Sequence, residues 1–151
     1  MSNNFDFQIW YQRLKSCESL SSENESDQFL HLLDEAEKNM SYEVALALIS
    51  TFSDADDFGV QERTRNVLEA ADRHVFYPAL IEGLGGLVER SPEKQWALTL
   101  VGIEVDYGDF GLLLNYVNKA REKDRSTALS FMRSEDFVSE YPNVLSYLNS
   151  I

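Results

Sequence analysis

The residues Ala47-Leu48-Ile49 recur as Ala79-Leu80-Ile81 and, in weaker form, as Gly111-Leu112-Leu113, each time 32 residues further along the chain. A second helix is predicted to open thirteen residues after each start. These openings fall at Val60, Pro92 and Asp124. A fixed period of this size is typical of stacked helical pairs, because one pair alone cannot bury its apolar face.

The spacing of apolar residues is helical nearly throughout. Apolar side chains recur every three or four positions, as in Phe7, Trp10 and Leu14, and no long alternating run indicates a strand. The predicted fold is all-α, a single domain over 1–151 with about eight or nine helices in stacked antiparallel pairs. The repeat units are predicted over about 41–73, 74–106 and 109–134.

Local signals predict where individual helices begin. Ser91-Pro92-Glu93-Lys94 is the clearest, because serine as N-cap, proline at the first helical position and acid in the first turn all favour a helix start. In the helix expected over 74–90, Gly83, Gly85 and Gly86 indicate either a break or a close approach of another helix. Further helices are predicted over about 4–17, 60–73, 124–134 and 142–150.

The period also aligns three rows of apolar residues. The rows are Leu48, Leu80 and Leu112, then Ile49, Ile81 and Leu113, and finally Leu68, Leu100 and Met132. This coincidence predicts that the rows form the core. Trp10 and Trp96, which lie on apolar helical stripes, are predicted to belong to the core as well.

The chain is strongly acidic, with 26 acidic and 13 basic residues and a formal net charge of −13. An acidic surface repels nucleic acid and anionic membranes, so neither is expected as a direct partner. The same field attracts a basic protein, although acidity also serves solubility. Residues 1–53 and 54–110 carry net charges of −6 and −7, whereas residues 111–151 are neutral. An electrostatic binding surface is therefore expected in the first two thirds.

Three segments between predicted helices, 54–58, 106–110 and 135–141, combine carboxylates with aromatic rings. Carboxylates pair with lysine and arginine, and aromatic rings supply rigid contact area, so the segments indicate an interaction surface. Helix capping remains an alternative role for each acid. The predicted partner-binding residues, which include three acids from second helices, are Asp54, Asp56, Asp57, Glu62, Glu69, Glu104, Asp106, Tyr107, Asp109, Glu135, Asp136, Glu140 and Tyr141.

The stretch from Leu48 to Asp56, followed by Val60 and Arg63, resembles a HEAT-like repeat. It has an apolar first helix, an acidic turn, and valine and arginine at the opening of the second helix. The resemblance implies an α-solenoid. The period of 32 residues is shorter than the usual HEAT length of about 40–47, so the units would be clipped.

A small acidic chain of HEAT-like helices with aromatic–acidic loops is also similar to the helical immunity proteins of bacterial polymorphic toxin systems, including contact-dependent growth inhibition. The resemblance lies in size, charge and architecture over about residues 41–134. It implies a 1:1 complex with one cognate basic toxin domain, such as a nuclease, whose active site the acidic surface covers. The alternative is a HEAT-like scaffold or adaptor that binds a peptide or helix of another partner.

The sequence carries no motif for catalysis, such as a Gly-x-Ser-x-Gly, a P-loop or a dinucleotide fingerprint. His31 and His74 lack a ligand-spaced partner, which argues against zinc. The acids at 54–57 fit calcium poorly, because Phe58 occupies a ligand position and Arg65 stands where glutamate is required. We therefore predict a protein that is not an enzyme, with no catalytic residue, no cofactor and no metal.

The expected location is the cytoplasm. The first residues lack the basic and apolar regions of a secretory signal. The longest apolar run, 75–88, is interrupted by Pro78, Glu82 and three glycines, so no membrane span is predicted. Cys17 is the only cysteine and can form no internal disulfide.

Overall fold

The computed structural model describes residues 5–55 and 59–149, and within these ranges it contains ten α-helices and no strand. The helices are α1 (Phe7–Cys17), α2 (Glu23–Lys38), α3 (Tyr42–Ile49), α4 (Val60–Ala70), α5 (Arg73–Arg90), α6 (Trp96–Asp106), α7 (Phe110–Lys119), α8 (Glu122–Met132), α9 (Glu135–Glu140) and α10 (Val144–Leu148). The predicted all-α fold of stacked helices is confirmed. The predicted units correspond to the pairs α3–α4, α5–α6 and α7–α8.

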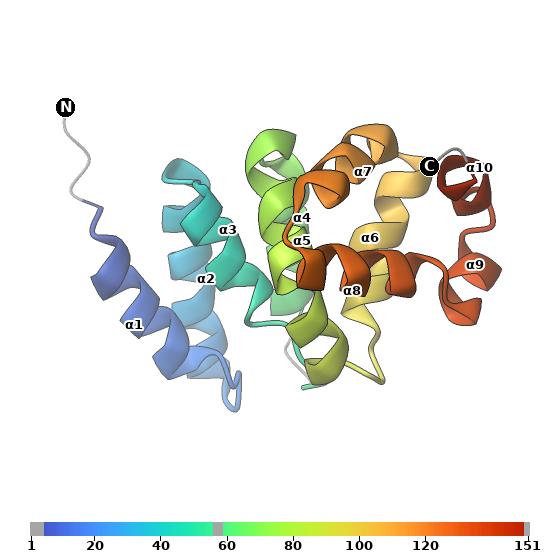
Figure 1. Ribbon diagram of the computed structural model, residues 1–151. Coiled ribbons are helices and arrows are strands. Elements are labelled where there is room, and N and C mark those ends of the chain that lie inside the picture. The colour runs from blue at the N-terminus through green and yellow to red at the C-terminus, as the bar shows by residue number, and fades with distance from the viewer. Residues whose placement is uncertain (1–4, 56–58, 150–151) are drawn as a thin grey trace.

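The array runs from α1 at one end to α9 and α10 at the other, and α8 lies beside α5 in the middle (Figure 1). Many of them begin at a side chain that accepts a hydrogen bond from the first turn. Ser41 Oγ accepts from the amide of Val44 at 3.2 Å, and Asp109 Oδ1 accepts from the amide of Leu112 at 3.1 Å. The same role is filled by Asp6, Ser22, Asp72 and Ser134.

The helix start predicted at Ser91 is wrong, because α6 begins at Trp96. Ser91 instead ends α5, and its hydroxyl donates to the carbonyl oxygen of Leu87 at 2.8 Å. The amides of Glu93 and Lys94 donate to the carboxylate of Asp54 at 3.1 and 2.8 Å. Gln95 has a left-handed backbone with φ of 53°, so residues 91–95 form a turn that does not continue into α6.

The tenth helix explains the difference from the expected eight or nine. The sequence predicts an acidic connection over 135–141, but Glu135–Glu140 forms the short helix α9. Ser134 Oγ accepts from the amide of Phe137 at 3.3 Å, which caps this helix. Phe137 is the one buried residue of α9 and is 0% exposed. This single ring therefore provides the main anchor of α9.

Helix α5 lies at the centre of the array and contacts α3, α4, α6, α7 and α8. It continues through its three glycines without a break. A Cβ atom at Gly83 would lie 2.8 Å from Cγ2 of Ile49, so the close approach of α3 requires glycine at this position. At its C-terminus, Arg90 donates to the carbonyl oxygens of Ile49 and Phe52 at 3.0 and 3.2 Å and so caps the end of α3.

The predicted core rows are confirmed, with Leu112 alone only half-buried. They belong to one hydrophobic cluster that extends from Trp10 in α1 to Leu148 in α10. Trp10 is buried, and its indole N–H donates to the carbonyl oxygen of Leu32 at 3.0 Å. Trp96 is half-buried against the ring of Phe52, with 5.0 Å between the ring centroids. A continuous core of this kind joins all the repeat pairs.

Candidate functional site

The acidic turns lie at opposite edges of the helix array. The α3–α4 connection, which contains Asp54, lies at the lower edge in Figure 1, whereas the α6–α7 turn, with Asp106, Tyr107 and Asp109, lies at the upper edge. This follows from the alternation of antiparallel helices, which places successive connections at opposite ends. The predicted binding residues therefore do not form one continuous surface.

Two of the predicted acids hold backbone amides in place. Asp54 accepts from the amides of Glu93 and Lys94 and so links the α3–α4 connection to the α5–α6 connection. Asp109 caps α7 by accepting from the amide of Leu112. The capping alternative is thus observed for Asp109, whereas Asp54 joins two connections and caps no described helix. Their replacement would disturb local structure as well as charge.

The two acids predicted on α4 are partly neutralised. Glu62 and Glu69 both pair with Arg65, and the distance from Arg65 Nη1 to Glu69 Oε1 is 2.9 Å. The hydrogen bond with Glu62 is the main cause of a raised pKa of the Arg65 guanidinium. Both acids contribute less field to a partner than unpaired carboxylates would. Asp56 and Asp57 lie outside the described residues.

Glu104 is 6% exposed, so it is not part of the candidate surface. The hydroxyl of Tyr77, a buried residue of α5, donates to Glu104 Oε1. The same hydroxyl oxygen accepts from the amide of Asp109 at 3.1 Å. Burial raises the pKa of the Glu104 carboxyl, and burial together with Glu104 raises the pKa of Tyr77 to about 12. This pair connects α5, α6 and the α6–α7 turn inside the molecule.

The structure brings four predicted residues together at one end of the array. Asn143, before α10, donates to Asp106 Oδ1 at 3.4 Å, which places the α6–α7 turn beside the α9–α10 connection. Tyr107 is 84% exposed. Burial raises the pKa of Tyr141, and the nearby charges of Glu140 and Asp106 raise it further. We call Asp106, Tyr107, Glu140 and Tyr141 the acidic–aromatic patch.

The two tyrosines of the patch differ in environment. Tyr107 carries a ring that is almost free of the protein, as predicted for an exposed contact residue. Tyr141 is half-buried, because its ring lies on Gly102 of α6, where a Cβ atom would meet the ring at 2.0 Å. Tyr141 therefore fixes the position of the patch, and Tyr107 offers most of its free aromatic surface.

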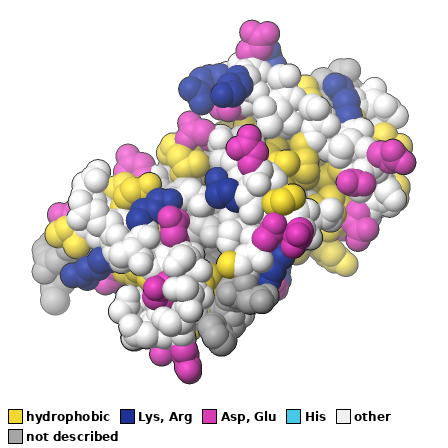
Figure 2. Space-filling view, turned by 90° about the horizontal axis from the view of Figure 1, so that it is seen from below, with side chains coloured by type: hydrophobic (Ala, Val, Ile, Leu, Met, Phe, Trp, Pro, Cys, Tyr) yellow, Lys and Arg dark blue, Asp and Glu magenta, His cyan; other side chains and the backbone are white. Residues whose placement is uncertain are grey.

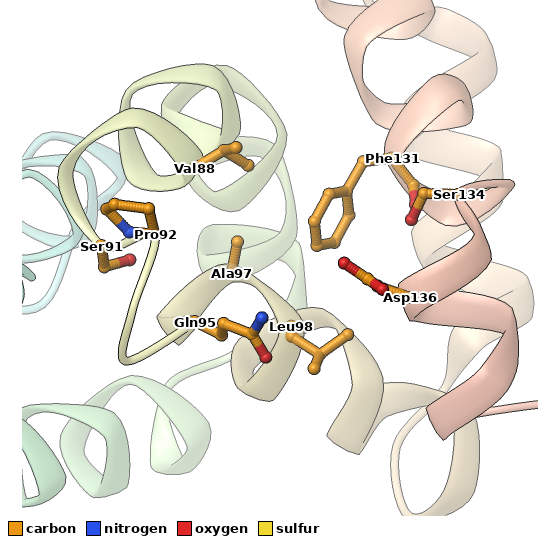
Figure 3. A pocket seen from close by; sticks show the side chains of 9 residues that line it. All are labelled: Val88, Ser91, Pro92, Gln95, Ala97, Leu98, Phe131, Ser134 and Asp136. Carbon is orange, nitrogen blue, oxygen red and sulfur yellow. The ribbon is translucent and has the colours of Figure 1, made fainter.

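A second feature was not predicted as a functional site. A pocket of about 320 Å³ opens between the α5–α6 connection and the α8–α9 junction (Figure 3). We call it the Phe131 pocket. It is lined by Val88, Ser91, Pro92, Gln95, Ala97, Leu98, Phe131, Ser134 and Asp136. Glu135 and Asp136 are both exposed, but only Asp136 lines the pocket.

The lower face of the molecule carries exposed apolar side chains. In Figure 2, hydrophobic side chains gather on the half of this face that carries the later helices, and acidic side chains surround them. Val88 is 39% exposed. In the sequence, Phe131 is indistinguishable from the core residues beside it, because exposure depends on the α8–α9 junction. The one sign of this pocket in the sequence is an apolar residue, Phe131, close to the acidic segment 135–141.

Comparison with known proteins finds no matching family model, curated protein or solved structure. Among the described residues, no group of three histidine, cysteine, aspartate or glutamate side chains is arranged to hold a metal ion. His74 Nδ1 lies 2.5 Å from the hydroxyl of Tyr116, and His31 is exposed on α2. No described helix is both long and apolar enough to span a bilayer. The geometry of the patch and the pocket therefore carries the functional argument.

Proposed function

We propose that this chain is an immunity-type inhibitor that binds one basic toxin domain in the cytoplasm, 1:1, and covers its active site. The observation that carries the proposal is the acidic–aromatic patch, in which an 84% exposed tyrosine stands beside carboxylates on a chain with a net charge of −13. The resemblance in size, charge and helical architecture to immunity proteins of polymorphic toxin systems supports it.

The patch suits a basic protein surface for two physical reasons. The Tyr107 ring offers rigid contact area, the kind of group that dominates binding energy in many interfaces. Asp106 and Glu140 can pair with lysine or arginine through charge-assisted hydrogen bonds. The field of the whole chain also accelerates the encounter with a basic partner. In a toxin that grips phosphates, the carboxylates would occupy the phosphate positions.

The first test identifies the partner. The tagged chain is used to capture proteins from the source cells, and the expected partner is a basic domain that arrests growth when produced alone in a host. Co-production of this chain is expected to restore growth. A captured protein that causes no arrest, or an arrest that the chain does not relieve, would contradict the inhibitor proposal and favour a scaffold that binds a peptide or helix.

Tyr107→Ala is expected to weaken the complex about 30-fold, the effect of losing an interface anchor worth about 2 kcal/mol. The exposed ring contributes little to the core, so the free energy of unfolding should stay nearly constant. Surface plasmon resonance with the captured domain measures the dissociation constant. Tyr107→Phe, which keeps the ring, is the control. An alanine variant that binds as tightly as the original chain would exclude Tyr107 as an anchor.

Asp106→Asn with Glu140→Gln is expected to lower the association rate about threefold to tenfold at low salt and much less at high salt, since screening weakens steering. The matched control is Glu23→Gln with Asp27→Asn, two exposed acids of α2 that remove the same charge. Stopped-flow association measures both pairs. An equal decrease in the control pair would assign the steering to net charge and not to the patch.

A further inference from the structure

The Phe131 pocket combines apolar walls with one carboxylate. Val88, Ala97 and Leu98 form much of the apolar surface, and the Phe131 ring lies opposite the α5–α6 connection (Figure 3). Asp136 points its carboxylate into the pocket, close to this ring. An apolar cavity with a carboxylate at one side favours a ligand that has an aliphatic part and a positive charge.

The carboxylate of Asp136 lies in the first turn of α9 but does not cap this helix. Helix α9 is already capped by Ser134, whose Oγ accepts from the amide of Phe137 at 3.3 Å. No described residue forms a hydrogen bond or ion pair with Asp136, and its neighbour Glu135 does not line the pocket. Asp136 therefore differs from Asp54 and Asp109, whose carboxylates hold backbone amides.

The other polar side chains of the lining differ in whether they already have a hydrogen-bond partner. Ser91 Oγ donates to the carbonyl oxygen of Leu87 at 2.8 Å, and Ser134 Oγ donates to that of Phe131 at 2.7 Å. Gln95, at the start of α6, keeps its side-chain amide available among the described contacts. Asp136 and Gln95 thus supply acceptors for a ligand with several N–H groups.

We propose that the Phe131 pocket receives an arginine side chain of the protein partner. The aliphatic stem covers Val88 and Leu98, and the planar guanidinium lies on the Phe131 ring and pairs with Asp136. Arginine suits this arrangement better than lysine, because its planar group forms bidentate pairs with carboxylates and stacks on aromatic rings. The net charge of −13 attracts such a cation.

The surroundings leave space for the chain that carries this arginine. A groove between α5 and α8 adjoins the pocket and shares Val88, Phe131 and Ser134 with it. The partner backbone would follow this groove while one side chain enters the pocket. The inference rests on the proposed function for the source of the arginine, but recognition of arginine by the pocket is measurable without any partner.

The test is an NMR titration of the full chain with N-acetyl-arginine N-methylamide, read on backbone amide shifts. Binding with a dissociation constant on the order of 1 mM is expected, with shifts centred on Leu98 and on residues 131–137. The citrulline analogue, which keeps the shape but not the charge, is expected to bind about tenfold more weakly. The lysine analogue tests whether the pocket recognises positive charge alone. The leucine analogue tests whether it recognises an apolar side chain alone.

Two variants locate the interaction. Asp136→Asn is expected to weaken arginine binding about tenfold, and Phe131→Leu about threefold through loss of the stacked ring. Glu135→Gln, which removes the neighbouring charge outside the lining, should leave binding unchanged. If Asp136→Asn fails to fold, the comparison of the arginine and citrulline analogues on the unaltered chain still tests whether the pocket recognises the charge of arginine.

Several results would overturn the inference: no shifts at the pocket residues, equal binding of the citrulline or leucine analogue, or an unchanged affinity in Asp136→Asn. Tighter binding of the lysine analogue would also overturn the assignment to arginine. These failures would leave the acidic–aromatic patch as a toxin-binding surface intact, since no partner is present in the titration. Conversely, Tyr107→Ala should not alter the arginine titration, so the two proposals fail separately.

Discussion

Replacing Phe137 by alanine is expected to lower the free energy of unfolding by about 3–5 kcal/mol, the usual cost of removing a fully buried phenylalanine. The ring is 0% exposed and packs against Phe131 and Tyr141, each with 5.4 Å between ring centroids. It is also the buried anchor of the six-residue helix α9. Such a loss is a large part of the stability of an ordinary domain. Urea denaturation followed by circular dichroism measures it.

The same substitution tests how the two candidate sites are built. Phe137 supports Phe131 on one side and Tyr141 on the other, so its loss should impair the Phe131 pocket and the acidic–aromatic patch together. Val138→Ala, at a half-buried position of the same helix, is the control and should cost only about 1 kcal/mol. If Phe137→Ala cost no more than Val138→Ala, α9 would have an anchor other than this ring.

Tyr77→Phe is expected to cost about 2–3 kcal/mol when Glu104 is ionised, because the change removes the donor to a buried carboxylate. The hydroxyl of Tyr77 donates to Glu104 and accepts from the amide of Asp109, so both groups lose their partner. Denaturation with urea at several pH values measures the loss. The double variant Tyr77→Phe with Glu104→Met should recover much of it, since no buried carboxylate then remains unpaired.

The pH dependence of this loss follows from the raised pKa of Glu104. A carboxyl whose folded pKa lies above its ordinary value of 4.5 favours folding while it is protonated. Its contribution is complete below 4.5 and is lost as pH rises through the folded pKa. The cost of Tyr77→Phe should therefore be larger above the raised pKa of Glu104, where the carboxyl is ionised, than below it, where the carboxyl is protonated. A cost that does not vary with pH would contradict the assignment of Glu104 as the affected group.

Much of the fold could be predicted because it depends on local patterns. The 32-residue period identified Leu48, Leu80 and Leu100 as core, and all three are buried. The start of α3 at Ser41 was equally local, since its hydroxyl caps the helix. Apolar periodicity and caps act within a few residues, so sequence alone reveals them.

The failures came from contacts between distant parts of the chain. Ser91-Pro92-Glu93-Lys94 has every local mark of a helix start, yet Asp54 takes the amides of Glu93 and Lys94, and α6 begins later. Glu104 sits close to an acidic turn in the sequence, but Tyr77 of α5 provides a hydroxyl that allows its burial. Neither partner could be assigned from spacing.

The candidate sites also differ in whether they depend on local sequence or on contacts between distant segments. Tyr107 was predicted as an exposed aromatic, and its neighbours in the turn made that prediction possible. The Phe131 pocket was not predicted, since it forms only where the α5–α6 connection meets the α8–α9 junction. A pocket between segments some 40 residues apart has no signature in a single sequence.

The central position of α5 determines the order in which the helices come apart. In a simple solenoid each unit touches only its neighbours, so the array can fray one unit at a time. The contacts of α5 are also with neighbouring units, but it touches both helices of the unit before it and both helices of the unit after it, and Arg90 at its end donates to the carbonyl oxygens of Ile49 and Phe52. The segment from α3 to α8 should therefore open as one cooperative block, whereas α1, which packs mainly on α2, can detach first. A partner side chain in the Phe131 pocket would therefore contact α5, α6 and α8 of this block together with α9, and so would join α9 to the block.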